Sequence, residues 1–281
     1  MSTALVTIAS GRHTHLRRQR EWLAAQSGAP LVHVVVSMGD PGIHEVVALR
    51  AEVPSVVVDL PAGKDLPLAA ARNAGVARAA RQGADRVVLL DVDCLPHPDM
   101  VRDYGRALDG LGSRRAVVSG RVQYLPEGLQ EHDHTPGNAA RVGRDHAARV
   151  LPPPGELAPA DPRMLWSLSM ACTVETWNAA GGFDERYVGY GGEDTDFGQR
   201  LAAVGGELWW YGGAAAYHQY HPTQSPPVQH AAAIARNANL FRRAWGFDPM
   251  EGWLRELAAL GHLTREGEDW RAVEQCSRNG A

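Results

Sequence analysis

The N-terminal part of the chain alternates between short apolar runs and longer segments of helical character. The apolar runs are rich in β-branched residues and lie at Ala4–Ala9, Leu31–Ser37, Ser55–Leu60 and Arg86–Asp91. Continuous apolar runs of this length are typical of strands buried on both faces of a parallel sheet. The segments between them predict helices at His15–Gln26, His44–Ala51 and Leu68–Gln82. This order predicts an α/β fold, a mixed sheet flanked by helices and joined by right-handed crossovers.

Beyond Asp99 the apolar pattern is interrupted. The residues after Asp99 predict a helix that runs to Leu108 and then a strand at Ala116–Leu125. Residues 126–162 are rich in proline and carry the sequence His-Asp-His at positions 132–134. Long connections of this kind in a compact domain are often functional. We interpret the segment either as an active-site flap or acceptor-binding insertion, or as a variable surface loop.

Regular elements return after Leu165. In order, the pattern predicts a strand at Trp166–Val174, a helix beginning near Glu175, a helix at Asp194–Val204, a strand at Glu207–Tyr211, and amphipathic helices at Val228–Trp245 and Pro249–Leu263. The polar residues after Glu266 are expected to fray. The last two helices carry an apolar stripe that we interpret as packing, with a dimer interface or a membrane-facing surface as the alternative. Its members are Ile234, Leu240, Phe241, Trp245, Trp253, Leu254 and Leu257.

Composition narrows the class of protein. Hydrophobic residues make up 44% and charged residues 21% of 281 residues, which is typical of a globular protein rather than a disordered one. The net charge of −4 gives no reason to expect a nucleic-acid partner. Cys94, Cys172 and Cys276 are odd in number and widely spaced, which argues against a disulfide framework or a structural zinc site.

We expect a cytoplasmic protein, because the N-terminus does not resemble a signal peptide and no apolar run is long enough to span a membrane. One locally basic segment, residues 12–20, leaves peripheral membrane contact open. A solvated helix face is the simpler interpretation of that segment.

Two carboxylates close the fourth predicted strand. Asp91 and Asp93 are separated by Val92. In open α/β sheets ligands bind beyond the carboxyl ends of the strands, so this is a place where a ligand is expected. If the strand ends between the two residues, both carboxylates can reach one point and hold Mg²⁺ or Mn²⁺ beside a diphosphate. The alternative is a pair that merely caps turns and helix ends.

An acidic, glycine-rich sequence precedes the helix predicted at Asp194–Val204. Gly191 and Gly192 can adopt positive φ or let the backbone approach a ligand. Glu193, Asp194 and Asp196 follow at the positive end of the helix dipole, which by itself explains acidic residues there. A carboxylate that faces a pocket at this junction is also a candidate general base.

Two further pairs of residues are candidates for the site. His218 and His221, three positions apart in an expected loop after a strand, can supply a metal ligand. Arg72 and Asn73 stand near the start of the third predicted helix, where a guanidinium and helical amides suit phosphate groups. An exposed helical arginine and solvent-exposed histidines are the structural alternatives.

Taken together, these motifs resemble the GT-A glycosyltransferases. The opening strand, the Arg72-Asn73-x-Gly75 sequence and the Asp-x-Asp pair are similar to family 2. The stretch from Trp166 to His221 is similar to galactosyltransferases, with Gly-Gly-Phe-Asp-Glu at 181–185 and Gly-Gly-Glu-Asp-Thr-Asp at 191–196 matching their pattern. The resemblance implies a GT-A domain over residues 1–222, divided into a nucleotide-sugar-binding half (1–125), an insertion (126–162) and an acceptor and catalytic half (163–222). A helical extension follows at 223–281.

The resemblance also implies roles for particular residues. Asp194 would be the catalytic base, with Glu193 holding the donor sugar or the acceptor. Asp93 would ligate Mn²⁺ or Mg²⁺ together with Asp91 and with His218 or His221. The residues expected at the nucleotide sugar are Ala9, Ser10, Arg12, Asp40, Arg72, Asn73, Asp91, Val92, Asp93, Gly191 and Gly192. The implied reaction is transfer of a sugar from a nucleotide diphosphate to an acceptor hydroxyl with inversion.

The sequence departs from these families at two places. Family 2 has Asp-Asp-Gly-Ser after the second strand, whereas this chain has Ser-Met-Gly-Asp at 37–40, so a GDP-sugar stays open beside the favoured UDP-sugar. Tyr190 stands where galactosyltransferases have tryptophan. The acceptor is open to a glycan, a lipid or a small molecule, and a homodimer is left open. The alternative functions are a haloacid-dehalogenase-like phosphatase with Asp91 as nucleophile and a non-catalytic nucleotide-sugar-binding protein.

Overall fold

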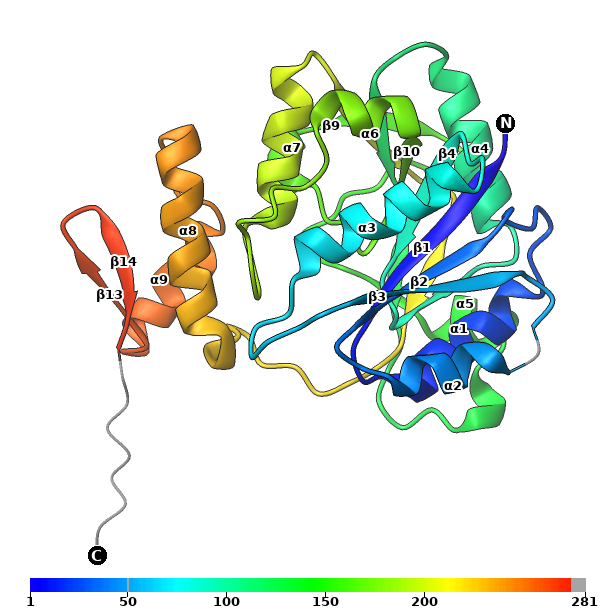
Figure 1. Cartoon of the computed structure of the whole chain (residues 1–281), viewed down its shortest axis with the longest axis horizontal. Helices are drawn as coiled ribbons and strands as arrows, with labels where there is room; N and C mark the ends of the chain where they lie inside the picture. The colour runs from blue at the N-terminus through cyan, green and yellow to red at the C-terminus, as the bar shows by residue number, and fades with distance from the viewer. Residues whose placement is uncertain (50, 274–281) are drawn as a thin grey trace, which may run out of the picture.

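The computed structural model describes residues 1–49 and 51–273, and it is built around one large mixed sheet (Figure 1). The sheet has eight strands in the order β3-β2-β1-β4-β10-β6-β11-β9. Their bounds are β1 Thr3–Ala9, β2 His33–Met38, β3 Ser55–Leu60, β4 Arg86–Leu90, β6 Ala116–Ser119, β9 Leu157–Ala160, β10 Ser169–Thr173 and β11 Glu207–Tyr211. The first four strands are parallel, as the apolar runs predict, and β10 runs antiparallel between β4 and β6.

Helices cover both faces of this sheet (Figure 1). One face packs against α3 (Leu68–Arg81), α6 (Val174–Ala180) and α7 (Glu193–Ala203), and the other against α1 (His13–Leu23), α2 (Gly42–Ala48) and α4 (Met100–Leu111). Successive side chains of β1 therefore enter different cores: Val6 packs with the first set of helices and Leu5 with the second. Burial on both faces explains why the strands are continuously apolar.

The strand predicted at Ala116–Leu125 is wrong, because the chain changes sheets in its middle. β6 ends at Ser119, and β7 (Val122–Tyr124) belongs to a second sheet of order β5-β12-β7-β8. The break falls at Gly120, whose amide donates to the Tyr104 hydroxyl at 2.9 Å. A Cβ at Gly120 would lie only 2.5 Å from the carbonyl oxygen of Ala214, so this close crossing requires glycine.

The second sheet also contains β5 (Cys94–Pro96), β8 (Arg144–Asp145) and β12 (Ala216–His218), none of which the pattern predicts. These strands are two or three residues long, too short to carry a recognisable alternation. Their pairing sets His218 opposite Cys94, next to the Asp-x-Asp pair. The second sheet thereby brings the histidine region to the carboxyl end of β4.

The proline-rich insertion is folded onto both sheets. It contains η1 (Glu131–Asp133), α5 (Pro136–Val142) and the strands β8 and β9, with η2 (Pro162–Met164) at its end. β8 pairs with β7 in the small sheet, and β9 pairs with β11 at the edge of the large sheet. Ala139 of α5 is buried against Trp22 and Tyr217. The segment expected as a long loop therefore contains short helices and strands, and its strands pair with both sheets.

The C-terminal extension forms a small packed unit beside the main domain (Figure 1). It consists of η3 (Val228–His230), α8 (Ala231–Trp245), α9 (Glu251–Ala259) and a hairpin of β13 (Leu263–Glu266) and β14 (Asp269–Ala272). The predicted fraying after Glu266 is wrong up to the last described residue, because Trp270 is buried and exchanges two 2.8 Å backbone hydrogen bonds with the Asn239 amide. Cys276 lies outside the described residues.

The apolar stripe of the extension packs inward, as the simpler interpretation has it. Ile234, Leu254 and Leu257 are fully buried in the core of the extension, and Phe241 joins the core of the main domain. No helix within residues 1–49 and 51–273 is both long and apolar enough to cross a bilayer.

The basic segment at residues 12–20 is largely occupied by contacts inside the protein. Arg20 is buried and donates to the carbonyls of Val46, Val47 and Leu49 at the end of α2. Arg18 pairs with Glu131 of the insertion. These contacts favour the interpretation as a helix face over a free lipid-binding patch; peripheral membrane contact stays a prediction.

Candidate active site

The loops that follow β1 and β2 are joined by one carboxylate. Asp40 accepts hydrogen bonds from the Gly11 amide at 2.6 Å and from the Gly42 amide at 3.0 Å, and its Oδ2 lies 2.8 Å from His13 Nε2. Burial opposes ionisation, but these donors together hold the pKa of Asp40 below its ordinary value. Asp40 therefore shapes the edge of the sheet at which the nucleotide is predicted to bind.

The other predicted nucleotide contacts on this edge have different surroundings. Ala9 and Val92 are buried together in one apolar cluster beneath the loops, whereas Ser10 is half-buried and Arg12 is exposed. Arg12 adopts φ 55° and ends the loop at the start of α1. Ser10 and Arg12 are thus the members of this group whose side chains reach solvent at the end of β1.

β4 ends at Leu90, just before the two carboxylates, so the side chains do not have to point to opposite faces. The Cys94 amide donates to the Asp91 carbonyl at 2.9 Å and closes a tight turn. The carboxylates nevertheless diverge. Asp91 Oδ1 lies 3.3 Å from Arg72 Nη2, whereas Asp93 points toward His218 and His221.

A series of buried, hydrogen-bonded polar side chains supports this turn. The Gln19 amide nitrogen donates to the Asp91 carbonyl at 2.8 Å and to the Cys94 carbonyl at 2.9 Å. Gln19 Oε1 in turn accepts from the Thr7 hydroxyl, which lies 3.1 Å from His33 Nε2. Gln19, Thr7 and His33 are fully buried, and no sequence motif pointed to them. They fix the backbone on which both carboxylates stand.

Asp93, His218 and His221 form what we call the His–Asp cluster. Their ligand atoms lie within 4.8 Å of one another, with Asp93 Oδ2 3.2 Å from His221 Nε2 and 3.6 Å from His218 Nε2. All three side chains keep a small exposed fraction. Burial opposes ionisation of Asp93, but His221 and His218 hold its pKa below the ordinary value. An ionised carboxylate facing two imidazoles suits a divalent metal.

Only some of the predicted metal ligands lie close together in the structure. His218, which ends strand β12 rather than lying in a loop, and His221 both reach Asp93. Asp91, predicted as a ligand beside Asp93, is not part of the cluster. It pairs instead with Arg72, because the turn directs the two carboxylates apart.

Arg72 links the Asp-x-Asp turn to the acidic helix. Its Nη1 lies 3.5 Å from Glu193 Oε1, and its Nη2 lies near Asp91. Burial lowers the pKa of Arg72, but the carboxylates of Asp91, Asp194 and Glu193 outweigh it and raise that pKa. Glu193 is 8% exposed, and its burial raises its own pKa. This arrangement places a guanidinium and a carboxyl group side by side between β4 and α7.

Asp194, the predicted base, has one oxygen held and one oxygen free. The Ser167 amide donates to Oδ2 at 3.1 Å. Oδ1 is buried and has no hydrogen-bond partner among the described residues. A carboxylate fixed in this way has an unused acceptor that can take a proton from a bound hydroxyl.

The helical extension holds the loop that leads to Asp194. The buried Asn237 amide of α8 donates to the carbonyls of Gly191 at 2.9 Å and Val188 at 3.2 Å. Gly191 and Gly192 adopt φ 94° and 91°, and a Cβ on Gly191 would lie 2.9 Å from Met250 Sδ. Their predicted positive φ is confirmed, and close packing against the extension is the physical reason for Gly191.

Asn73, expected at the nucleotide sugar, and Tyr190, which stands where galactosyltransferases have tryptophan, both contact other residues of the protein. Asn73 donates to the Phe183 carbonyl and to Glu185, both at 2.9 Å, and accepts from the Phe183 amide. It thus anchors the glycine-rich stretch, and its contact with the nucleotide stays a prediction. The Tyr190 ring stacks on His230, with centroids 4.9 Å apart, and on Trp253, with centroids 5.7 Å apart.

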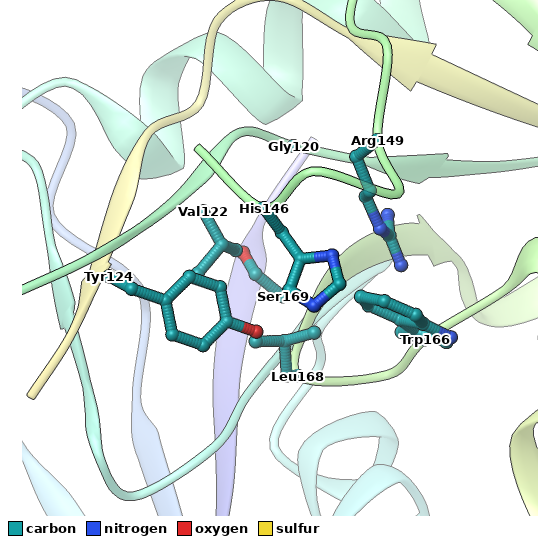
Figure 2. A pocket seen from close by; sticks show the side chains of 8 residues that line it. All are labelled: Gly120, Val122, Tyr124, His146, Arg149, Trp166, Leu168 and Ser169. Carbon is teal, nitrogen blue, oxygen red and sulfur yellow. The ribbon is translucent and has the colours of Figure 1, made fainter. Parts of the chain in front are cut away.

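A pocket beside the His–Asp cluster contains residues that sequence reasoning missed (Figure 2). Tyr124 of β7 stacks on His218, with ring centroids 4.8 Å apart. His146 and Arg149 come from the insertion, and Trp166 stands just before Ser167. His146 and Arg149 carry no motif, and the folding of the insertion brings them to Tyr124 and Trp166.

The comparisons with known proteins agree with this architecture. Residues 161–222 match the family described as the N-terminal domain of galactosyltransferase. No curated protein is significantly similar in sequence. Solved structures are similar in fold: GalNAc-T7 with UDP, GalNAc and Mn²⁺ has a TM-score of 0.57 at 13% identity, over 92% of this chain and 57% of that chain.

TarS of S. aureus is similar to the same extent. Its 1–349 fragment has a TM-score of 0.56 at 15% identity, over 93% of this chain and 79% of that chain. The same fragment in complex with UDP has a TM-score of 0.57 at 14% identity. The chain therefore has the GT-A fold, and the matched segment together with this fold supports a glycosyltransferase of the GT-A type. The GT-A fold leaves no support for the phosphatase alternative.

Proposed function

We propose that this chain is a metal-dependent, inverting glycosyltransferase that uses a nucleotide-diphosphate sugar, with a UDP-sugar favoured. The observation that carries the proposal is the state of Asp194, whose Oδ2 is held by the Ser167 amide while Oδ1 is buried and unpartnered. GalNAc-T7 and TarS, which share the fold, were solved with UDP, and GalNAc-T7 also with Mn²⁺. This supports UDP over GDP as the nucleotide.

The reaction follows from these residues. The acceptor hydroxyl gives its proton to Asp194 Oδ1 while its oxygen attacks the anomeric carbon. The bond from that carbon to the diphosphate oxygen breaks, and its electron pair leaves with the diphosphate. One displacement from the face opposite the leaving group inverts the anomeric carbon. Arg72 and Glu193 orient the donor sugar between β4 and α7.

The His–Asp cluster is the place for the divalent ion. When bound, such an ion supplies positive charge that stabilises the departing diphosphate. Mg²⁺ prefers oxygen ligands in a strict octahedral geometry, whereas imidazole is a better ligand for transition metals. Two histidines and one aspartate therefore favour Mn²⁺ over Mg²⁺ at Asp93, His218 and His221.

Calorimetric titration of the full chain with UDP, GDP and TDP, each with and without Mn²⁺, tests the proposal. We expect UDP to bind only when Mn²⁺ is present. The anomeric configuration of the product from a UDP-sugar, read by NMR, then tests inversion. Failure of all three diphosphates to bind under both conditions overturns the proposal.

A non-catalytic nucleotide-sugar-binding protein is the remaining alternative. It would bind the same diphosphate but would leave a UDP-sugar intact in the presence of every acceptor. Hydrolysis or transfer that disappears in Asp194→Asn separates the enzyme from the binding protein.

A further inference from the structure

Gln219 stands between the two histidines of the His–Asp cluster in the sequence, and its side chain is fully buried. Its backbone amide donates to the Asp93 carbonyl at 2.7 Å, so it also joins the histidine segment to the turn that carries the aspartate. His218 directly precedes Gln219, and His221 follows one residue later than the next position. A shift of Gln219 would therefore move both imidazoles relative to the carboxylate.

Helix α1 holds the Gln219 side chain. Its Oε1 accepts from Arg18 Nη1 at 3.2 Å, and its amide nitrogen donates to the His15 carbonyl at a long 3.5 Å. The next residue of α1, Gln19, donates to the carbonyls of the Asp-x-Asp turn. Adjacent residues of α1 thus support the two parts of the His–Asp cluster, the histidine segment and the aspartate turn.

The insertion fixes the Arg18 guanidinium in turn. Arg18 Nε lies 3.2 and 3.1 Å from the two carboxylate oxygens of Glu131, and Nη2 donates to the same carboxylate at 2.5 Å. Arg18 Nη1 also lies 3.4 Å from His134 Nε2. The hydrogen bonds from Arg18 outweigh the effect of burial and hold the pKa of Glu131 below its ordinary value, so this carboxylate is ionised and offsets the guanidinium charge.

The charge of Arg18 distinguishes two possible roles. A positive charge close to a cation site repels the cation and by itself weakens metal binding. An arginine at this place can therefore favour metal binding only through the geometry of its hydrogen bonds, with Glu131 as its counter-ion. Without Arg18, the Gln219 side chain would keep only the long hydrogen bond to His15, and the histidine segment would be less firmly placed.

We propose that Arg18 and Gln219 are positioning residues of the metal site, and that the insertion takes part in metal binding because Glu131 fixes Arg18. The inference rests on the proposed function. It goes beyond that function because it gives a role to residues that are not ligands of the metal, and to a segment that carries none of the cluster. The insertion thereby supports the metal site from outside it.

Titration of the full chain with Mn²⁺, followed by electron paramagnetic resonance first without and then with UDP, tests this role. Gln219→Met should weaken Mn²⁺ binding by about tenfold or more, as the loss of indirect support for metal ligands does. Arg18→Gln acts one step further away and should weaken it by about threefold or more. Removal of a positive charge alone would instead tighten Mn²⁺ binding, so the sign of the change separates positioning from electrostatics.

The contribution of the insertion is measured by a double-mutant cycle. Glu131→Gln should weaken Mn²⁺ binding less than Arg18→Gln does, because Arg18 keeps its bond to Gln219. In the Arg18→Gln background the same change should have almost no further effect, since the two residues act as one unit. Additive effects would show that Glu131 does not act through Arg18.

Matched control variants remove comparable groups elsewhere. Arg17→Gln removes the same charge from the same helix, where Arg17 pairs with Glu21 at 2.9 Å and reaches Glu131 only at 3.5 Å. Its Mn²⁺ affinity should be unchanged or higher. Gln26→Met removes a half-buried amide outside the cluster, and Glu156→Gln an exposed carboxylate of the insertion, and both should bind Mn²⁺ like the wild-type chain. Thermal unfolding of each variant separates loss of binding from loss of folding.

Arg18 keeps 17% of its side chain exposed, so Arg18→Gln decides the question even if Gln219→Met fails to fold. The inference is overturned by an Mn²⁺ affinity of Arg18→Gln equal to or above that of the wild-type chain, or by equal losses in Arg17→Gln and Arg18→Gln. If UDP binds with Mn²⁺ while either of these results is found, the positioning role fails and the proposed function stands. If the wild-type chain binds neither Mn²⁺ nor UDP, the proposed function fails and the positioning role fails with it.

Discussion

The Trp245 indole nitrogen donates a 2.8 Å hydrogen bond to Asp196 Oδ1, joining the end of α8 to the first turn of α7. The same oxygen lies 3.2 Å from the Tyr187 hydroxyl. Asp196 stands two residues after Asp194, so the helical extension directly supports the helix that carries the predicted base. The extension is therefore hydrogen-bonded to the main domain at the helix that carries the predicted base.

Removing the indole donor should loosen this junction. Trp245→Phe leaves a buried carboxylate with one donor fewer, and we expect it to lower the free energy of unfolding by about 1.5–3 kcal/mol. Turnover should fall more than UDP affinity, because α7 carries the base. Trp209→Phe removes a similar bond to the half-exposed Glu207 and should have a smaller effect on stability and none on turnover. Equal effects of the two variants in denaturant unfolding would contradict this role.

The base assignment predicts a separation of binding from chemistry. Asp194→Asn keeps the size of the side chain but cannot accept the proton, so transfer should fall by about 10²–10⁴-fold with UDP affinity nearly unchanged. Initial rates and calorimetry with UDP and Mn²⁺ measure the two quantities. Asp184→Asn, which changes a carboxylate paired with Arg186 in the preceding loop, serves as the control. Near-normal turnover in Asp194→Asn would remove Asp194 from its role.

Metal affinity should depend on the His–Asp cluster. We expect Asp93→Asn and His221→Ala each to weaken Mn²⁺ binding by at least about tenfold, since the first removes the charge of a ligand and the second removes a ligand. His44→Ala is a matched control, because His44 pairs with Asp59 at 2.8 Å in an exposed pair outside the cluster. Titration of Mn²⁺ by electron paramagnetic resonance gives the affinities. Unchanged binding in both cluster variants would place the metal elsewhere.

The buried polar side chains of Gln19, Thr7 and His33 support the backbone of the Asp-x-Asp turn. They should therefore affect binding of the donor. Gln19→Met leaves the Cys94 carbonyl without the Gln19 donor, at a cost of about 1–3 kcal/mol, and the Asp91 carbonyl with the Cys94 amide alone, and it should weaken UDP binding as well as stability. Gln26→Met removes a comparable bond of 2.7 Å to the His97 carbonyl. It should lower stability without changing UDP affinity, and a parallel loss of affinity in both variants would argue against a specific role of Gln19.

His33, one of these buried polar side chains, predicts a pH dependence of stability. Full burial lowers the pKa of His33 to about 3, below the value of about 6.5 in the unfolded chain. The unfolded state therefore binds one proton more between these two values. This contribution to stability is complete above pH 6.5 and is lost as the pH falls, by up to about 1.4 kcal/mol per pH unit.

Denaturant unfolding between pH 7 and pH 4 measures this effect. His33→Gln should flatten the acid slope by up to one proton, whereas the exposed His132→Gln should leave it unchanged. A wild-type slope equal to that of His33→Gln would show that His33 does not titrate in this way.

The linear sequence by itself determined the β-α framework and the chemistry at its strand ends. Continuous apolar runs identify β1 to β4, because burial on both faces excludes polar residues from them. Asp93, His218 and Asp194 are recognisable because each stands in a local motif whose spacing is fixed by a turn or a helix start. The observed helix bounds are also close to the predicted ones, because local sequence largely sets where a helix begins and ends.

Only the tertiary structure decided which side chains meet. The turn after β4 sends Asp91 to Arg72 and Asp93 to the histidines, a division that the Asp-x-Asp spacing cannot express. Strands of two or three residues, such as β12, are too short to show an alternation of apolar and polar residues. They form because they pair with neighbouring strands. Asn237 acts through hydrogen bonds to residues 46 and 49 positions away in the sequence. Such contacts depend on packing between elements, which no local pattern records.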